Sequence, residues 1–364
     1  MGLSPKIRSV AIRVDSSQRI GSGHVMRCVT LASALVATGV EVSFICRDLP
    51  GHYADWLHTQ GFAVTLLPAS KSVPKVSDNV YSSWLGENMA IEIAQCQAAL
   101  VKEDIDWIIV DHYALDATWE RAVCPPDARI LVIDDLADRL HDCNLLLDQN
   151  YHKDGAARYQ RIAPKAELLL GPMYALLRPD FITCRQELRS RLGKVNKLLI
   201  SFGGSDNNNV TYTVLRALAR INRSDLKIDV IAGQANPHFE ELRRHCNLIG
   251  AYLYRHVDNM AVRIAGADLG IGATGVSTWE RAFLGLPTLA VSVADNQREI
   301  ARQVDSLGLL RWLGDSNFVS ENDWRDALDW ACSNADALIA QSRAGMEIVD
   351  GMGAYRIIEK MHAN

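Results

Sequence analysis

The chain has 364 residues, of which 48% are hydrophobic and 22% charged, and its net charge is −5. The length suits two domains, and the acidic balance excludes a general nucleic-acid binder, whose surface would be basic. No apolar run reaches membrane-spanning length and the N-terminus lacks a signal-peptide core, so we expect a cytoplasmic monomer with no membrane anchor and no nucleic-acid partner.

Short β-rich runs alternate with helical segments in the first half of the chain. The predicted strands lie at residues 10–14, 41–46, 62–67, 107–111, 129–134 and 144–148. A helix is expected over about 25–38, and Gly39 fits a left-handed cap at its end. Residues 71–81 are polar, contain Pro74 and are expected to form a loop.

The alternation stops at residues 172–181, which contain two prolines, and then restarts. The second half has predicted strands at residues 197–204, 227–233, 248–254, 267–273 and 288–293, a predicted helix over about 210–222 and a helical pattern over 323–361. We therefore predict a first domain over 1–175, a second over 176–345, and a C-terminal helix over 346–364 that crosses back to the first domain.

Most of these strands are continuous apolar runs, which are typical of parallel strands covered by helices on both faces. The strand–helix alternation predicts an α/β fold with two Rossmann-like, doubly wound domains that face a cleft, a GT-B-type arrangement. Ligands of such sheets bind outside the carboxyl ends of the strands, so both domains would direct those ends at the cleft.

The first glycine turn is "GSGH", where Gly21 and Gly23 precede His24 at the start of the first helix. The positive end of a helix favours a neutral imidazole, and a neutral imidazole can act as a general base. An alternative is a glycine turn with a histidine that merely caps or packs. A dinucleotide fingerprint would need glycine where Met26 stands, so no dinucleotide cofactor is expected.

Metal motifs are absent from the sequence. The eight cysteines form no CxxC pair and the ten histidines are dispersed, so we expect no metal and no cofactor. Asp134 and Asp135 follow a predicted strand and could bind a metal, although capping of a turn explains them better.

A second glycine turn, "SFGGSDNNN", follows the first strand of the second domain. Its backbone amides near Gly203 and Gly204 could hold a diphosphate, or the turn could simply require glycine. Ser205 or Asp206 could cap the helix, and an Asp206 carboxylate facing a diphosphate would repel it.

The stretch "GIGATGVSTWERAFLGLPTL" ends one strand and begins a helix. Glu280 could accept hydrogen bonds from a vicinal diol such as ribose, while the helix start beside it would face phosphate oxygens. The spacing of Ser277 and Glu280 is equally that of a capping box.

Two further strand ends carry polar side chains. In "ADNQREI", Asn296 and Gln297 could read a base edge or sugar hydroxyls, or Asp295 or Asn296 could cap a helix. In "VDHYALD", Asp111 and Tyr113 would lie at the cleft rim, where Tyr113 could hold a sugar substituent or pack half-buried.

These motifs together resemble the UDP-2,4-diacetamido-2,4,6-trideoxy-β-L-altropyranose hydrolases of pseudaminic acid biosynthesis, the PseG family. The resemblance covers most of the chain and rests on the ordered motifs "RVDSSQRIGSGHVMRCVTLA", "VDHYALD", "GPMYALLRPDF", "SFGGSD", "GATGVSTWER" and "ADNQ". That family is similar to the two-domain GT-B glycosyltransferases, whose C-terminal half binds UDP.

The resemblance implies metal-independent hydrolysis of the anomeric C–O bond with inversion, releasing UDP and the free sugar. It implies that His24 activates water and that Tyr113 and Asn296 hold the sugar. The implied UDP ligands are Gly204, Ser205, Gly275, Ser277, Thr278, Glu280 and Gln297. From their place beside His24 or at the cleft rim, we expect Arg13, Asp15, Gly21, Gly23 and Asp111 to wall the sugar pocket.

The chain departs from the family at one loop. The family usually has GAGGSTTWE where this sequence has "GATGVSTWE", so Thr274 replaces a glycine and Val276 a hydroxyl residue. Two other functions use the same residues. A GT-B glycosyltransferase would pass the sugar to an acceptor hydroxyl, and a non-catalytic nucleotide-sugar-binding protein would turn nothing over.

Overall fold

The computed structural model describes residues 7–70, 81–101, 104–204, 206–221, 223, 225–234, 236–255 and 257–364. Apart from Tyr81, the predicted loop at 71–81 lies outside these residues. The chain forms two compact units, one reaching to Leu176 and including Met352–Asn364, the other covering Leu177–Gly351. No helix within the described ranges is long and apolar enough to cross a bilayer.

The first unit is built on a parallel sheet with the strand order β3-β2-β1-β4-β5-β6-β7. Its strands are β1 (Ser9–Val14), β2 (Glu41–Arg47), β3 (Ala63–Leu67), β4 (Trp107–Asp111), β5 (Arg129–Ile133), β6 (Leu145–Asp148) and β7 (Glu167–Leu170). Its helices are α1 (Gly23–Ala37), α2 (Ala54–Thr59), η1 (Ser82–Trp84), α3 (Met89–Leu100), α4 (Ala117–Val123), α5 (Gly155–Tyr159), η2 (Pro172–Tyr174) and α14 (Gly353–Ala363).

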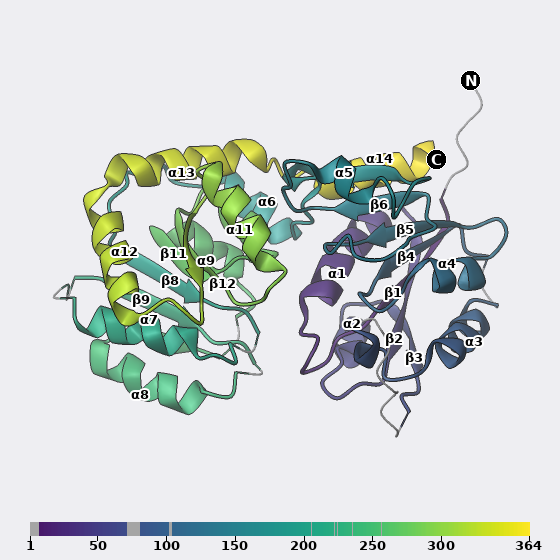
Figure 1. Ribbon diagram of the computed structural model, residues 1–364, viewed down its shortest axis with the longest axis horizontal. Coiled ribbons are helices and arrows are strands. Elements are labelled where there is room, and N and C mark those ends of the chain that lie inside the picture. Colours follow the sequence, from purple (N-terminus) through teal and green to yellow (C-terminus); the bar gives the residue numbers. More distant parts are fainter. Residues whose placement is uncertain are drawn as a thin grey trace. The chain divides into compact units, whose positions relative to one another are not determined.

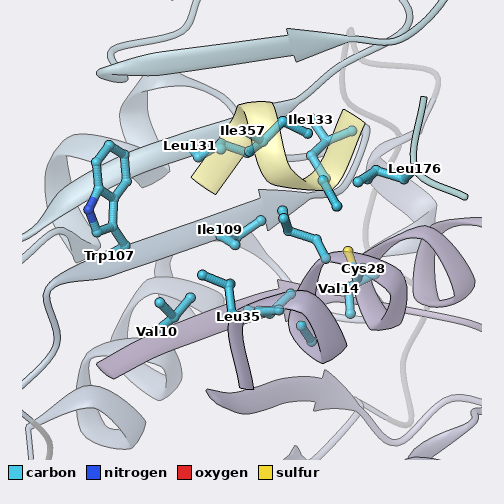
Figure 2. Packing of buried hydrophobic residues seen from close by; sticks show 14 of the residues in the cluster. Val10, Val14, Cys28, Leu35, Trp107, Ile109, Leu131, Ile133, Leu176 and Ile357 are labelled. Atoms are coloured by element: carbon cyan, nitrogen blue, oxygen red, sulfur yellow. The ribbon is translucent and has the colours of Figure 1, made fainter. Parts of the chain in front are cut away.

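Helices cover both faces of this sheet because successive strand residues point to opposite sides. Helices α1 and α14 pack on one face, where Val10 and Ile109 share a buried cluster with Leu35 and Ile357 (Figure 2). Helices α3 and α4 pack on the opposite face, on Ala11 and its neighbours (Figure 1). This double cover explains the continuous apolar runs seen in the sequence.

The second unit has a parallel sheet with the order β10-β9-β8-β11-β12-β13. Its strands are β8 (Lys197–Ser201), β9 (Lys227–Ile231), β10 (Tyr252–Tyr254), β11 (Leu269–Ala273), β12 (Thr288–Ser292) and β13 (Arg311–Asp315). Its helices are α6 (Pro179–Gln186), α7 (Val210–Ala219), α8 (Phe239–Ile249), α9 (Met260–Gly266), α10 (Ser277–Phe283), α11 (Gln297–Ser306), α12 (Glu321–Ser333) and α13 (Ala335–Ile348). The predicted fold class, α/β with two parallel doubly wound sheets, is confirmed.

Several predicted boundaries differ from the structure. Helix α13 continues to Ile348, and the segment that joins the first unit begins at Met352, so the predicted start at 346 is too early. The predicted strand at 248–254 is wrong in its first part, because α8 runs to Ile249 and ends at Gly250, whose φ of 72° is left-handed. The edge strands β7 and β13 were not predicted, since neither is a fully buried apolar run.

Each sheet reverses its strand order at one place. In the first unit the reversal lies between β1 and β4, where Val14 is the partner of Asp111. In the second unit it lies between β8 and β11, where Ser201 is the partner of Gly272. A crevice at the carboxyl end of the strands is expected at such a reversal, so both places are candidate sites.

Candidate functional site

His24 lies at the start of α1, directly after the turn that follows β1. Gly21 has a left-handed φ of 81°, and its backbone N–H donates to Ser17 O at 2.8 Å, which closes the turn. A Cβ at Gly21 or Gly23 would meet nothing within 4 Å, so both glycines border open space beside the histidine.

His24 is paired with Asp111 from the end of β4. The two atoms His24 Nδ1 and Asp111 Oδ1 are 2.6 Å apart. Because a carboxylate can only accept, Nδ1 carries the proton, and Nε2 is left with its lone pair. No residue in the described part of the chain hydrogen-bonds Nε2, and 12% of the His24 side chain is exposed. This arrangement is that of a general base oriented by a carboxylate.

Arg27 holds Asp111 in place from one helical turn after His24. Its Nε and one terminal nitrogen donate to the two Asp111 oxygens at 2.6 and 2.7 Å. Its other terminal nitrogen donates to Asp135 at 2.7 Å. Burial alone would raise the pKa of Asp111, but the neighbouring charges of Arg27 and His24 outweigh it and hold that pKa well below its usual range.

Tyr113 belongs to the same cluster through Asp135. Its hydroxyl donates to Asp135 at 2.7 Å, and its ring meets the His24 ring edge-on with centroids 4.7 Å apart. Burial and the Asp135 charge raise the pKa of Tyr113 well above its ordinary value, so the phenol stays protonated. Trp84 stacks on the Tyr113 ring at 5.5 Å and adds an aromatic wall.

Three expected sugar contacts are corrected by the structure. Arg13 and Asp15 are buried, and Arg13 donates to Asp15 at 2.6 and 2.8 Å and to Glu92 at 2.7 Å. They form an internal ion network, completed by Arg47, that leaves neither side chain able to reach a ligand. Asp111 is also buried, and both its oxygens are taken by His24 and Arg27, so it orients the His24 imidazole and offers no free oxygen to a sugar.

The two aspartates after β5 have separate roles. Asp134 accepts from the Ala137 N–H at 2.8 Å and pairs with Arg139, so it stabilises the turn. Asp135 joins the His24 cluster and accepts from Asn150 at 2.9 Å. Where the structure describes the chain, no group of three or more acidic, histidine or cysteine side chains could hold a metal ion.

The loop from β11 to α10 carries the expected UDP ligands of the second unit. The Gly275 N–H donates to the Thr278 hydroxyl at 3.2 Å, so Thr278 closes the loop. Ser277 is the first residue of α10 and Val276 the N-cap, which makes the capping-box alternative wrong. Thr274 is buried and has no left-handed backbone, so the loop accepts threonine in place of the family's glycine.

Glu280 is half-buried one turn into α10. Its carboxylate has no hydrogen-bond partner among the described residues. Burial raises the pKa of Glu280, and the charges of Arg178 and Arg281 oppose that rise. An unbonded carboxylate in this setting can accept two hydroxyl hydrogen bonds.

The other expected ligands of the second unit lie at neighbouring strand ends. Gly204 is exposed after β8, and Ser205 lies outside the described residues. Asp206 is buried and caps α7 by accepting from the Val210 and Thr211 N–H groups at 2.9 and 3.0 Å, so its carboxylate is directed at the start of the helix.

Two amides follow β12. Asn296 is exposed, and its side chain makes no capping bond to α11, which makes its N-capping role wrong. Gln297 uses its Oε1 to accept from the Val293 N–H at 3.0 Å, and its Nε2 lies beside Gly275.

The sequence did not point to Arg27 or Trp84, and it gave Asp135 only as a metal ligand or a turn cap. Arg27 could have been found, because residues three apart on a helix share a face and His24 is such a neighbour. Asp135 and Trp84 come from distant segments, and no local pattern connects them to His24.

No protein-family model matches the chain. It is similar to the spore coat polysaccharide biosynthesis protein SpsG of Bacillus subtilis, with 22% identity over 96% of both chains. It is also similar to the UDP-2,4-diacetamido-2,4,6-trideoxy-β-L-altropyranose hydrolase of Campylobacter jejuni, with 26% identity over 66% of this chain and 74% of that protein. The uncharacterized protein MJ1062 of Methanocaldococcus jannaschii is 25% identical over 80% of this chain. The matched part spans 57% of that longer protein.

Solved structures share the fold. MurG of Acinetobacter baumannii has a TM-score of 0.65 and 12% identity, over 98% of this chain and 100% of that one. LpCGTa, crystallised in complex with UDP, has a TM-score of 0.68 and 15% identity, over 98% and 99%. The fold is therefore that of the GT-B glycosyltransferases, and the family resemblance seen in the sequence is supported.

Proposed function

We propose that the protein hydrolyses UDP-2,4-diacetamido-2,4,6-trideoxy-β-L-altropyranose to UDP and the free sugar, with inversion at the anomeric carbon. The observation that carries the proposal is the 2.6 Å pair of His24 and Asp111 at the strand-order reversal of the first unit. The sequence similarity to the Campylobacter hydrolase of that name supports the same substrate class.

The chemistry assigned to the first unit is water activation. Nε2 of His24 takes a proton from water while the water oxygen attacks the anomeric carbon. The bond from that carbon to the UDP oxygen breaks, and UDP leaves with the electron pair. Arg27 lies between two carboxylates, Asp111 and Asp135, so these three groups carry one excess negative charge that stabilises the imidazolium formed in this step.

Sugar binding is assigned to Tyr113 and Asn296. Tyr113, whose hydroxyl donates to Asp135, would contact an acetamido group of the sugar. Asn296, whose side chain is exposed and unbonded within the described residues, would hold a sugar substituent.

UDP binding is assigned to the second unit. The Glu280 carboxylate would accept from the ribose hydroxyls, and Gly275, Ser277 and Gln297 would line the diphosphate side. UDP is a stable leaving group, so the proposal needs neither a strong general acid nor a metal ion.

One assay separates this proposal from its rivals. The purified protein is incubated with the UDP-sugar and no acceptor, and the anomeric proton is followed by NMR. The hydrolase releases free sugar of inverted configuration, at an unchanged rate with a chelator present. Release that depends on an added acceptor would identify a glycosyltransferase.

The variant His24→Ala completes the test. Loss of a general base lowers turnover by about 10²- to 10⁴-fold, while UDP affinity should change little. A non-catalytic nucleotide-sugar-binding protein would bind UDP with no turnover before or after the substitution.

A further inference from the structure

Arg281 lies beneath the loop that joins β11 to α10, and it is not among the ligands that the sequence predicts. It is 5% exposed, yet it forms no salt bridge with a carboxylate within the described residues. Its hydrogen-bond acceptors are a carbonyl and hydroxyls, and its Nε has no partner. A buried cation without a paired anion is costly, so its presence here calls for an explanation.

The guanidinium reaches the loop at both of its ends. One terminal nitrogen donates to the Ala273 carbonyl at 2.7 Å, where β11 ends. The other donates to the Ser277 hydroxyl at 3.0 Å, where α10 begins. Thr278 Oγ1 lies 3.5 Å from the first of these nitrogens and also accepts from the Gly275 N–H. Arg281 therefore fixes the conformation of residues 273–278.

The strand glycines make room for this side chain. A Cβ at Gly272 would lie 3.1 Å from an Arg281 terminal nitrogen and 2.4 Å from Ser201 O. A Cβ at Gly270 would lie 3.3 Å from Arg281 Cδ. The spacing of glycines in "GIGATG", which suggested a ligand turn, thus accommodates a buried guanidinium against β11.

We propose that Arg281 is a positioning residue for a nucleoside diphosphate, an inference that rests on the proposed use of this loop for UDP. Since the Ser277 oxygen accepts from Arg281, its own proton is free to be donated to a phosphate oxygen. The positive charge beneath the loop, which no salt bridge neutralises within the described residues, favours a bound diphosphate and offsets the negative charge that UDP gains as it leaves.

Electrostatics agree with this role. Burial lowers the pKa of Arg281 to about 10, and the Glu280 charge opposes that shift. The guanidinium remains charged at neutral pH, and an arriving anion adds to the Glu280 charge a counter-charge closer to the loop.

The test compares binding of UDP with binding of uridine, measured by calorimetry on the full chain. Arg281→Met should weaken UDP binding at least about tenfold while uridine affinity changes less than about twofold. Arg281→Lys keeps the charge and should recover part of the UDP affinity, and it preserves the test if the methionine variant does not fold.

Arg191 provides a matched control from the same unit. It is a partly buried arginine that donates to the carbonyls of Ala267, Ile264 and Leu284, the last of which caps the other end of α10. Burial lowers the pKa of Arg191 to about 10 as well. Arg191→Met should lower the melting temperature without changing the ratio of UDP to uridine affinity.

The outcomes are separable. Equal losses for UDP and uridine in Arg281→Met would reduce Arg281 to a structural residue and overturn the inference, as would unchanged UDP binding. A wild-type protein that binds UDP, shows the Arg281 effect and releases no sugar would overturn the hydrolase proposal alone. A wild-type protein that does not bind UDP would overturn both.

Discussion

The Nδ1 atom of His24 lies 2.6 Å from Oδ1 of Asp111, although 87 positions separate the two residues in the chain. One lies in the first turn of α1 and the other at the last position of β4. The adjacent pairing of these two strands, with Val14 opposite Asp111, creates the contact. The site in the first unit is thus a product of sheet topology.

Asp111→Asn should lower turnover by about 10²-fold or more, because an amide can present its N–H to Nδ1 and stabilise the wrong tautomer of His24. Single-turnover sugar release measures this effect. The substitution also leaves buried Arg27 with a weaker partner, and we expect a loss of about 3 kcal/mol in the free energy of unfolding.

The matched control for that variant is Asp104→Asn. The Asp104 side chain is 92% exposed and pairs with Arg8 at the surface, so neither turnover nor stability should change measurably. Full activity in Asp111→Asn would remove the orienting role from the carboxylate.

Tyr113→Phe keeps the ring that packs on His24 and Trp84 and removes the hydroxyl that donates to Asp135. We expect kcat/KM to fall by about tenfold or more, with UDP affinity retained, because a hydrogen bond to the sugar is lost. Steady-state kinetics with the UDP-sugar and calorimetry with UDP distinguish this from a general loss of structure, which would weaken both.

Glu280→Gln should weaken UDP binding by about tenfold, because a neutral amide accepts hydrogen bonds from ribose hydroxyls less strongly than a carboxylate. The same substitution should have little effect on 2′,3′-dideoxy-UDP, which lacks both hydroxyls. An equal loss for both nucleotides would place Glu280 away from the ribose.

Asp148 provides a prediction for the pH dependence of stability. Burial and the nearby Asp135 charge raise the pKa of Asp148 to about 7. The folded state then binds more protons than the unfolded state between about pH 4 and pH 7. The contribution of this group to the free energy of unfolding is complete below about pH 4 and is lost as pH rises through 7.

Asp148→Asn should remove this fall in the free energy of unfolding, which is on the order of 2 kcal/mol between about pH 4 and pH 7. Urea unfolding at several pH values measures it. The neighbouring His152 acts in the opposite direction, because burial and Arg158 lower its pKa to about 4. His152 lies 3.6 Å from Asp148, so the variant His152→Gln is measured beside Asp148→Asn, and parallel pH profiles for wild type and Asp148→Asn would contradict the assignment.

Local sequence determined a large part of the fold and the chemical types at the site. Continuous apolar runs indicated parallel strands, and the glycine turns after β1, β8 and β11 marked where ligands of such sheets bind, because these signals depend on residues close together in the chain. His24 could be singled out in the same way, since its place at a helix start is a local property.

Tertiary structure alone decided what each candidate side chain contacts. Arg13 and Asp15 are tied to Glu92 inside the first unit, Asp111 faces His24 and not a ligand, and the glycines before Arg281 make room for its guanidinium. The physical reason is that burial and pairing depend on which strands and helices lie side by side. Residues such as Asp135 and Glu92 reach their partners only once the sheet has brought distant segments together.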